Sequence, residues 1–547
     1  MSSLESLWSF QRDSEEASSS SSERTVPRNV AAIDIGTNST HLLVASVDPV
    51  LHTFSVNLAE KSTTRLGEKD PDSGELTKNA IRRVLETLKR FKDLAESHKV
   101  EQIVVVATSA VREAPNGREF LDQIKENLDL DVDLISGPEE ARLIYLGVLS
   151  GLPFEKKPHF ILDIGGGSTE LILADGRDAR ALTSTRIGAV RLQRDFVKQE
   201  PLSLSRLEFL RTFIQGSLEP ATDKVLRRLK PGEQPLMVAT SGTALAIGSL
   251  IASEELDSPL KLHGFKFSRL KLDKLVEKLV KLTPEQRRKL NPISDKRSEI
   301  IVPGALILQV SMHLMGMDEL ILSERALREG LIFDWMMRKG LLKDSFNFQS
   351  NIRERTVLHQ AHRFAVDIDR AKSVARNSLS LYDNTHGLLH HDLGEGRDLL
   401  WAASMLHACG KHINQSSYHK HSWYLIRHGE LLGYSDVEHL MVAAIARYHR
   451  RSLPRKRHES WQVFSKREHR QIVFEMSMLL RLSTSLDQRP EPAVDSIKVT
   501  STSTEIVFEL KNQSGQDLSL EKWSLMNCSN IIEDTFSLKV KIITPNN

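Results

Sequence analysis

One pattern occurs twice in the sequence, as AIDIGTNSTHLLV at residues 32–44 and as ILDIGGGSTELIL at residues 161–173. Each copy is an apolar run ending near an aspartate, a turn of small and hydroxyl residues, and a second apolar run. Two short apolar runs joined by such a turn predict a β-hairpin. Because small residues leave backbone N–H groups accessible in one concavity, a phosphate can approach the turn closely. The doubled hairpin is therefore a candidate phosphate-binding element.

The elements around each hairpin are repeated as well. In both copies the pattern predicts three short strands, a helix, an apolar strand such as EQIVVVATSAV (101–111) and a further helix. Continuous apolar strands of this kind are typical of a parallel sheet buried on both faces. The sequence therefore predicts an internal duplication, with one α/β domain at residues 29–150 and a second at residues 151–343.

The remaining segments differ in composition from the duplicated part. Residues 1–28 are rich in serine and acidic residues and predict a disordered tail. Residues 350–490 are helical in pattern and rich in histidine, and residues 491–547 predict a small strand-rich α+β domain.

Overall composition narrows the possible classes of protein. The chain has 547 residues, 40% apolar content, a net charge of only +2 and two cysteines. It has no apolar run of the ~18 residues that a membrane-spanning helix needs, and two cysteines cannot form a disulfide framework. We expect a cytoplasmic globular protein in which only local patches attract polyanions.

Charge considerations assign roles to the residues of the two hairpins. Asp34 and Asp163 cannot contact phosphate directly because both groups are anionic, so we expect these aspartates to hold Mg²⁺ on the phosphate. The alternative is two ordinary hairpins. If the two copies face each other, the turns would hold a phosphate chain between them, with these predicted contacts: Thr37, Asn38, Ser39, Gly166, Gly167, Ser168 and Thr169.

AIDIGTNST and LDIGGGSTE resemble the two phosphate motifs of the actin, sugar-kinase and heat-shock-chaperone superfamily. That resemblance implies two ribonuclease-H-like domains around an active-site cleft. The match is closer to the exopolyphosphatase/guanosine pentaphosphate phosphatase (Ppx/GppA) family and covers residues 29–342, continuing into the helical part. Its supporting segments are ATSAVREAPNG (107–117), ISGPEEARLIYLGV (135–148), RIGAVRL (186–192), ATSGT (239–243), IIVPGALIL (300–308) and ALREG (326–330).

The resemblance also implies which side chains carry the chemistry. Glu140 occupies the position of the family's water-activating base, and Arg112 is expected to contact phosphate oxygens. Glu139 points about 100° away from Glu140 on the same helix, so we expect it only to be stabilised by the helix dipole at the helix N-terminus. The same purely structural role is the alternative for Glu140. Arg112 could instead be a surface residue. Glu170 is either a third metal ligand or part of the hairpin flank.

In the helical part, the order of several residues is similar to that of HD metal-dependent phosphohydrolases. Ala408 follows the second histidine where those enzymes have an aspartate, so we expect a degenerate HD-like module. The residues are His362, His407, His421, His449 and Asp487.

A basic segment, RYHRRSLPRKRH (447–458), has six cationic side chains and no acidic one. We predict that it forms a polyphosphate channel, with a solvated basic loop as the alternative. No aromatic-rich basic face or nucleic-acid motif accompanies it, so no specific nucleic-acid partner is expected, and a homodimer would join two such segments. The cations are Arg447, Arg450, Arg451, Arg455, Lys456 and Arg457.

Together these features predict an Mg²⁺-dependent exopolyphosphatase that removes terminal phosphate from inorganic polyphosphate. Guanosine pentaphosphate is the alternative substrate for the same chemistry. Two alternatives without hydrolysis are an actin-like nucleotide-binding switch and a polyanion-binding regulator. SGTALAIGS (241–249) fits either an adenosine-binding loop or the start of a buried helix, so the sequence leaves nucleoside binding open.

Overall fold

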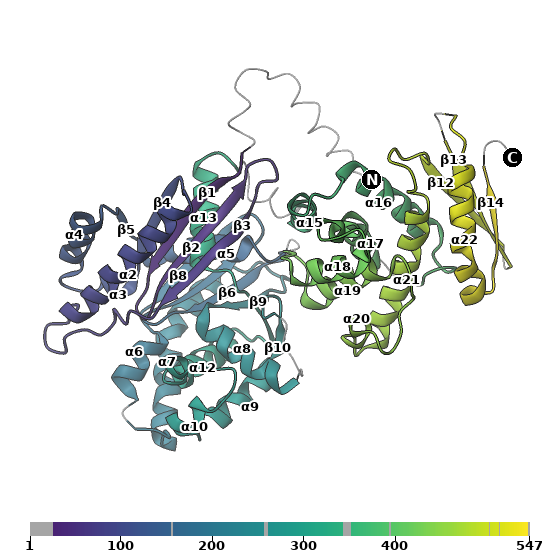
Figure 1. Cartoon of the computed structure of the whole chain (residues 1–547). Coiled ribbons are helices and arrows are strands. Elements are labelled where there is room, and N and C mark those ends of the chain that lie inside the picture. The colour runs from purple at the N-terminus through teal and green to yellow at the C-terminus, as the bar shows by residue number, and fades with distance from the viewer. Residues whose placement is uncertain are drawn as a thin grey trace. The chain divides into compact units, whose positions relative to one another are not determined.

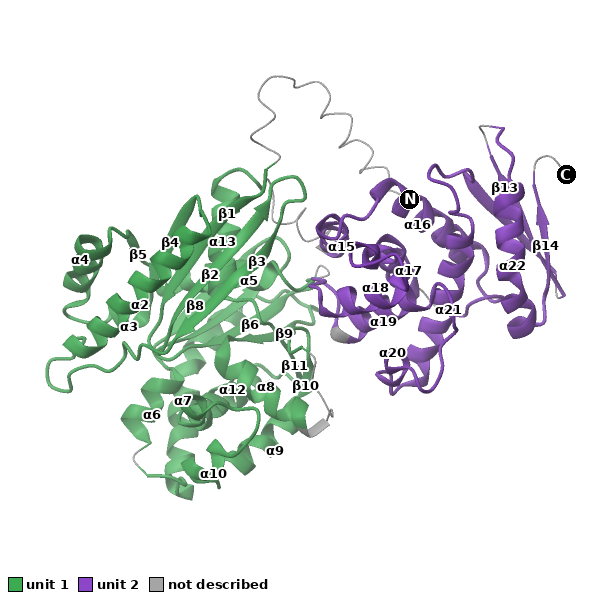
Figure 2. Ribbon diagram, viewed as in Figure 1, with its two compact units in different colours: residues 1–352 green, residues 353–547 purple. Residues whose placement is uncertain are grey.

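The computed structural model describes residues 26–154, 157–197, 199–255, 261–342, 352–392, 395–502, 504–512 and 515–544. The chain forms two compact units, Met1–Ile352 and Arg353–Asn547, which are treated separately below (Figure 2). Most of the predicted serine-rich tail, residues 1–25, lies outside the described residues. Among the described residues, no helix combines the length and apolar character needed to cross a membrane.

The first copy of the repeated pattern forms a five-stranded sheet (Figure 1). Its strand order is β3-β2-β1-β4-β5; β1 pairs antiparallel with β2 and parallel with β4. This register places Asp34, near the end of β1, opposite His41 of β2. The strands are β1 (Arg28–Ile35), β2 (Thr40–Asp48), β3 (Thr53–Ser62), β4 (Gln102–Ala107) and β5 (Val132–Leu134).

The second copy builds a sheet of the same plan with an added edge. The strand order is β10-β11-β9-β6-β7-β8, and Asp163 of β6 lies opposite Glu170 of β7, as Asp34 lies opposite His41. The predicted duplicated α/β fold is therefore confirmed. The strands are β6 (His159–Ile164), β7 (Thr169–Ala174), β8 (Ala179–Thr185), β9 (Leu236–Thr240), β10 (Lys266–Ser268) and β11 (Glu319–Leu322).

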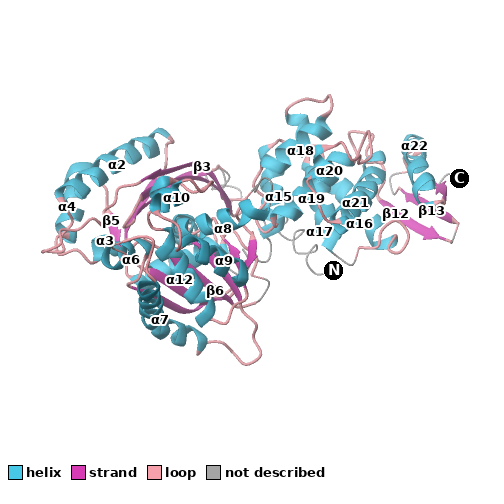
Figure 3. Ribbon diagram, turned by 90° about the horizontal axis from the view of Figure 1, so that it is seen from below, coloured by secondary structure: helices cyan, strands magenta, loops and turns pink. Residues whose placement is uncertain are grey.

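Helices cover these sheets and close two separate apolar cores. α12 is buried along nearly its whole length because it packs among α6, α7, α8 and α9 (Figure 3). The helices of unit 1 are α2 (Lys78–Ser97), α3 (Ser109–Arg112), α4 (Gly117–Leu128), α5 (Gly137–Leu149), α6 (Ala189–Phe196), α7 (Leu204–Leu226), α8 (Ser241–Glu255), α9 (Arg269–Leu279), α10 (Pro284–Arg288), α11 (Asp295–Ser298), α12 (Ile301–Leu314) and α13 (Leu327–Arg338).

Two helices are exchanged between the sheets. α5 follows the first copy in sequence but packs on β7 and β8, whereas α13 ends the second copy and packs on β1 and β2. The two helices cross at glycines: a Cβ on Gly147 would lie 1.8 Å from the Ala326 carbonyl oxygen, and one on Gly330 would lie 1.8 Å from that of Leu143. The crossing therefore leaves no room for a side chain at either glycine.

Unit 2 is a helical bundle with a three-stranded sheet, and one apolar core runs through both. β13 and β14 are parallel, so the chain crosses between them through α22, the helix of the predicted small α+β domain (Figure 1). The elements are α15 (Ile352–Arg363), α16 (Ile368–Asn384), α17 (Glu395–Leu406), η2 (Cys409–His412), α18 (Tyr418–His428), α19 (Asp436–Tyr448), α20 (Glu459–Gln462), α21 (Arg467–Ser485), β12 (Ser496–Ser501), β13 (Glu505–Lys511), α22 (Ser519–Phe536) and β14 (Lys539–Ile543).

Gly147→Ala tests the helix crossing. The added methyl group must push α5 and α13 apart, and we expect it to lower the free energy of unfolding by about 1–3 kcal/mol. Gly216→Ala in α7 is the matched control because its Cβ would have no neighbour within 4 Å; we expect a change of at most about 1 kcal/mol, in the stabilising direction. Urea unfolding followed by fluorescence measures both, and equal stabilities would contradict the tight crossing.

Candidate active site

The two turns of the repeated pattern have the same internal geometry. The Gly36 N–H donates to the Ser39 carbonyl at 3.1 Å, and the Gly165 N–H donates to the Ser168 carbonyl at 3.0 Å. Thr169, predicted to contact phosphate, is fully buried and donates its hydroxyl proton to the Ile187 carbonyl at 2.6 Å. The turns are therefore equivalent in backbone, while the hydroxyl of Thr169 already has a protein partner.

These two turns meet across the space between the sheets. The hydroxyl groups of Thr37 and Ser109 are 3.0 Å apart and share a hydrogen bond. A Cβ built on Gly167 would lie 2.7 Å from the Ser109 hydroxyl and 2.9 Å from that of Thr37, so only glycine fits there. The structure thus brings the predicted residues of both turns together, although they are separated by about 130 residues in the sequence.

Four carboxylates cluster beside the turns. Glu140, Asp163 and Glu170 are at most 8% exposed, and Asp34 has a buried Oδ1 without a hydrogen-bond partner among the described residues. Burial, the main cause, raises the pKa of Asp34 and of Asp163 to about 7 and that of Glu170 to about 8. Repulsion among neighbouring carboxylates acts in the same direction.

Glu140 and Arg112 face each other. Arg112 in α3 donates to Glu140 Oε2 through Nη1 at 3.3 Å and Nη2 at 3.4 Å, and to the Ile135 carbonyl at 2.6 Å. Burial, reinforced by the Glu170 charge, raises the pKa of Glu140, and Arg112 opposes this shift. Glu139 instead forms an ion pair with Arg142 at 2.7 Å.

The carboxylate cluster fits a hard divalent cation. Buried carboxylates with raised pKa values and an unpartnered Asp34 oxygen lack a compensating cation, and Mg²⁺ prefers oxygen ligands while retaining several waters. Glu170 has one oxygen bound by the Ser184 hydroxyl at 2.7 Å. Within the described part of the chain, no three His, Cys, Asp or Glu side chains are already arranged as a complete ligand set.

A group of cations near the carboxylates escaped the sequence prediction. The pKa of Lys61 is lowered to about 8, first by burial and then by Arg297 and Arg328, and the pKa of His41 falls to about 3 for similar reasons. Across the described ranges, neither Lys61 nor Arg297 forms a salt bridge. The cations come from β3, α11 and α13, and among them only Arg328, in ALREG, lay in a recognised segment; His41 belongs to the first copy of the repeated pattern and is uncharged.

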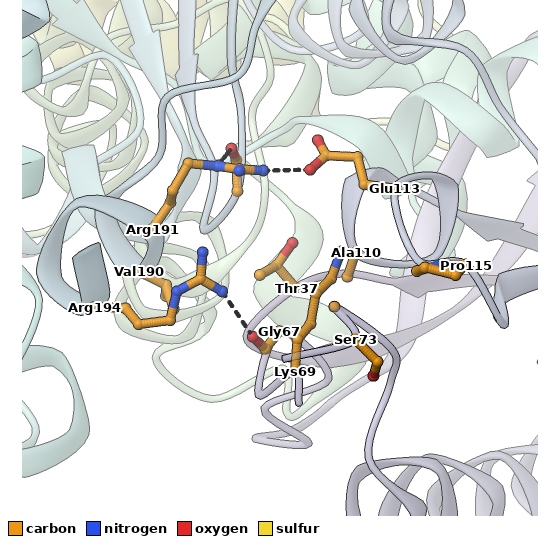
Figure 4. A pocket seen from close by; sticks show the side chains of 12 residues that line it. Thr37, Gly67, Lys69, Ser73, Ala110, Glu113, Pro115, Val190, Arg191 and Arg194 are labelled. Carbon is orange, nitrogen blue, oxygen red and sulfur yellow. Dashed lines mark hydrogen bonds and ion pairs between the residues drawn. The ribbon is translucent and has the colours of Figure 1, made fainter. Parts of the chain in front are cut away.

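A pocket of about 330 Å³ adjoins the contact between the turns, with Thr37 and Gly167 in its wall (Figure 4). Arg191 bridges the two domains there: it donates to the Gly167 carbonyl at 3.0 Å and to Glu113 at 2.5 Å. Arg194 reaches the Gly67 carbonyl at 3.4 Å, and Lys69 also lines the pocket. Three cations (Lys69, Arg191 and Arg194) and one acidic residue, Glu113, therefore line the pocket, so its side chains carry a net positive charge.

The possible adenosine-binding loop, SGTALAIGS (241–249), forms the start of α8. A Cβ on Gly242 would lie 2.2 Å from Arg297 Nη2, and Arg297 donates to the Thr243 hydroxyl at 3.2 Å. The guanidinium thus packs against Gly242 at the start of the helix. This contact agrees with the reading of the segment as a helix start.

In unit 2 the predicted histidine set is brought together only in part. The rings of His407 and His449 are 5.1 Å apart, whereas His362 is exposed and Asp487 is bound by Arg370. The basic segment divides as well: Arg447 is 9% exposed with an unpartnered Nη1. Its exposed members are Arg451, Arg455, Lys456 and Arg457, and Arg450 is half-buried.

Comparison with known proteins agrees with this architecture. Residues 43–339 match the Ppx/GppA phosphatase family, and residues 352–528 match domain III of Ppx/GppA phosphatases. Matched sheets and exchanged helices, with a carboxylate cluster beside the two turns, define a fold of the two-domain, actin-like class. The chain belongs to the Ppx/GppA phosphatase family.

Individual relatives show how far the similarity extends. A Vibrio vulnificus protein named guanosine-5'-triphosphate,3'-diphosphate pyrophosphatase is 28% identical over 85% of this chain and 88% of its own. The crystal structure of the Aquifex aeolicus Ppx/GppA family member is 29% identical, covers 57% of this chain and 99% of its own, and has a TM-score of 0.50. The crystal structure of an exopolyphosphatase from Cytophaga hutchinsonii is 26% identical, covers 57% of this chain and 98% of its own, and has a TM-score of 0.53.

The raised pKa values predict how stability depends on pH without metal. Unfolded carboxyl groups lose their protons near pH 4, but Asp34, Asp163 and Glu170 keep theirs in the folded protein to about pH 7–8. The folded state therefore binds more protons between these limits, and its stability falls as pH rises from 5 to 8.

Asp163→Asn removes one of these titrating carboxyl groups. The decrease in the free energy of unfolding with rising pH should therefore be smaller than in the wild type, by up to about 1.4 kcal/mol per pH unit. Thermal unfolding in EDTA from pH 5 to pH 8.5 measures the slope, and added Mg²⁺ should restore stability at pH 8. A variant slope equal to that of the wild type would show that Asp163 is not a proton-holding member of the cluster.

Proposed function

We propose that this protein is an Mg²⁺-dependent exopolyphosphatase, which releases terminal phosphate from inorganic polyphosphate by hydrolysis. The observation that carries the proposal is the presence of opposite charges around the turns: buried carboxylates, and a group of cations in which Lys61 and Arg297 form no salt bridge within the described residues. Hydrolysis of a phosphoanhydride needs neutralised charge at the phosphoryl group and a positioned water, with little other chemistry. The charged groups around the turns would meet the first requirement, and Glu140 would orient the water for the second.

Each group has a role that its surroundings favour. The turn backbones and the Thr37 and Ser168 hydroxyls hold the terminal phosphate, and Asp34 and Asp163, supported by Glu170, would hold Mg²⁺. When bound, the metal neutralises charge on the phosphoryl oxygens. Glu140 accepts the proton of the attacking water, a task suited to a carboxylate whose pKa is raised toward neutrality.

Arg112 is then both a phosphate contact and the orienting partner of Glu140. Its guanidinium holds the carboxylate in a fixed position from one side while leaving donors for a phosphate oxygen. Lys61, Arg297 and Arg328 bind the phosphates that follow the terminal one in the polyphosphate. A polyanion would relieve the repulsion among these cations, which now lowers the pKa values of His41 and Lys61.

The cationic pocket favours an inorganic chain over a nucleotide. None of the residues that line it is aromatic, so it offers no ring for a purine to stack on. Its cations Lys69, Arg191 and Arg194 suit a repeated phosphate unit instead. In unit 2 the basic segment 447–458 is proposed to bind more distant phosphates, with a steep dependence on salt, and a homodimer would present two such segments.

A second candidate substrate is guanosine pentaphosphate, converted to the tetraphosphate by the same groups. The observation in its favour is the Vibrio vulnificus relative, whose name specifies that type of nucleotide and whose similarity spans both units. The chemistry is unchanged in this case, and only the leaving group differs.

Glu140→Gln tests the proposal at its centre. The amide keeps the shape of the side chain but cannot accept a proton, so we expect phosphate release with Mg²⁺ to fall by about 10²–10⁴-fold. Glu139→Gln is the matched control; its carboxylate pairs with Arg142 on another side of the helix, and we expect activity within about twofold of the wild type.

Long polyphosphate, guanosine pentaphosphate and ATP should be offered in parallel. Fastest release from polyphosphate supports the first proposal, and fastest release from the guanosine nucleotide supports the second. Binding of polyphosphate or ATP without phosphate release from any substrate would instead identify a regulator or a nucleotide-binding switch. Full activity of Glu140→Gln would reject this glutamate as the base.

A further inference from the structure

Glu113 is the acidic residue in the wall of the pocket beside the turns, where the other charged residues are cations. We propose that Glu113 is a positioning residue for the second turn. Acting through Arg191, it fixes the peptide between Gly167 and Ser168, whose N–H donates to the bound phosphate. The identity of the bound group rests on the proposed function, whereas the contacts that lead from Glu113 to the turn are independent of hydrolysis.

The short helix α3 determines where Glu113 lies. Glu113 is the C-terminal cap of α3, and its N–H donates to the Ser109 carbonyl at 3.1 Å. Ser109 also shares a hydrogen bond with Thr37 of the first turn, and Arg112 of the same helix donates to Glu140. One helical turn of the first domain therefore contacts the first turn and the proposed base, and Glu113 extends these contacts to the second domain.

Glu113 and Arg191 form a close ion pair in the pocket wall (Figure 4). Arg191 Nη2 lies 2.5 Å from Glu113 Oε2, and the Glu113 side chain is only 13% exposed. Arg186 is the second cation near this carboxylate, but its Nε lies 3.9 Å from Oε1 and its side chain is 82% exposed. Because a long and solvated contact contributes little, Arg191 is the principal partner of Glu113.

The same guanidinium reaches the second turn. Arg191 Nε donates to the Gly167 carbonyl at 3.0 Å while Nη2 is bound to Glu113. A guanidinium is planar and rigid, so holding one of its nitrogens restricts the directions of the other two. Glu113 therefore sets the direction from which Arg191 approaches the carbonyl. Nη1 takes part in neither bond, so Arg191 can still contact a phosphate of the chain.

Three successive carbonyls of the second turn are held from the side of α6. The carbonyls of Gly165 and Gly166 accept backbone N–H groups of residues 189–191 at 3.0 Å. The third carbonyl, that of Gly167, accepts the side chain of Arg191 instead. The first two peptides are thus fixed by the backbone of α6, whereas the third depends on a side chain.

The orientation of these peptides decides where their N–H groups point. In a trans peptide, the carbonyl and the N–H of the next residue point in opposite directions. The N–H groups of residues 166–168 therefore face away from the partners of the three carbonyls, and a run of such groups can form an anion-binding concavity. The N–H of Ser168 belongs to the peptide that Arg191 holds, so it is the donor whose direction Glu113 controls.

The first turn is held differently. Its Thr37 carbonyl accepts the Gly67 N–H at 2.8 Å, and its Asn38 carbonyl accepts the Arg65 N–H at 2.9 Å. Backbone bonds hold both of these peptides. We therefore expect the first turn to be insensitive to a change at Glu113, which makes it an internal control.

A different role for Glu113 would give the opposite kinetic pattern. If its carboxylate only competed with phosphate for Lys69, Arg191 and Arg194, neutralising it would strengthen substrate binding and lower KM. A positioning role predicts a lower kcat instead, because a donor to the charge of the transition state is misdirected. KM then changes little, since the other phosphates of the substrate stay bound.

Phosphate release by Glu113→Gln separates these two roles. With saturating Mg²⁺ and the substrate that the wild type hydrolyses fastest, we expect kcat to fall at least about tenfold and KM to stay within about threefold of the wild type. Glu119→Gln is the matched control, because Glu119 is an exposed residue of α4; both constants should be unchanged. A lower KM with unchanged kcat would overturn the proposal.

Arg191→Lys shows whether Glu113 acts through Arg191. Lysine keeps the positive charge but has a single nitrogen, so it cannot hold the Gly167 carbonyl and Glu113 in one rigid geometry. We expect kcat to fall in this variant as well, and Glu113→Gln to add little to that loss, because two residues that act as a unit are not additive. Fully additive losses would show that Glu113 does not act through Arg191.

Hydrogen–deuterium exchange resolved to single amides reads the turns without turnover. Compared with chloride at equal ionic strength, Mg²⁺ with orthophosphate should slow exchange at residues 37–39 and 166–168 of the wild type. Glu113→Gln should lose most of the protection at Ser168 and keep that of Gly167 and of residues 37–39. Thermal unfolding confirms that the variant is folded.

The exchange result also separates a failure of this proposal from a failure of the proposed function. If the wild type releases no phosphate but protection of Ser168 still depends on Glu113, the positioning role holds and hydrolysis is what fails. Equal protection of Ser168 in the wild type and in Glu113→Gln, or no protection of the second turn in the wild type, would overturn the positioning role.

Discussion

The contact between the two hairpin turns is the constraint on which the site depends. Gly167 lies so close to the hydroxyls of Thr37 and Ser109 that a single methyl group would not fit between them. Residues of both domains are therefore brought into one small volume, which neither domain could enclose alone. The exchanged helices maintain this contact, since α5 and α13 each pack on the sheet of the other copy and cross at paired glycines.

This closeness has an electrostatic consequence. Burying Asp34, Glu140, Asp163 and Glu170 together is unfavourable unless a proton or a cation compensates them, which is why their pKa values are raised. Lys61 and Arg297, for which the described part of the chain offers no salt bridge, create the opposite imbalance nearby. In the function proposed above, a metal-bound phosphate chain would relieve both imbalances at once.

The sequence predicted those parts of this arrangement whose residues lie close together in the chain. Asp34 and Thr37 lie in one hairpin, as Asp163 and Gly167 do, so their grouping follows from short-range pattern and from the duplication. Lys61 and Arg297 carry no motif; strand pairing and the position of the short α11 bring them near the carboxylates, and only tertiary structure shows it. In unit 2, likewise, only the tertiary structure shows that Arg370 binds Asp487, because the two residues are 117 positions apart in the sequence.

The central claim is that both turns hold one phosphate, and a crystal structure of Glu140→Gln with Mg²⁺ and a short polyphosphate tests it most directly. The account predicts a terminal phosphate bonded to backbone N–H groups of residues 36–39 and 165–168, with Mg²⁺ on the side of Asp34 and Asp163. A phosphate held by one turn alone, or bound only at the Lys69 pocket with the turns still in contact, would contradict it.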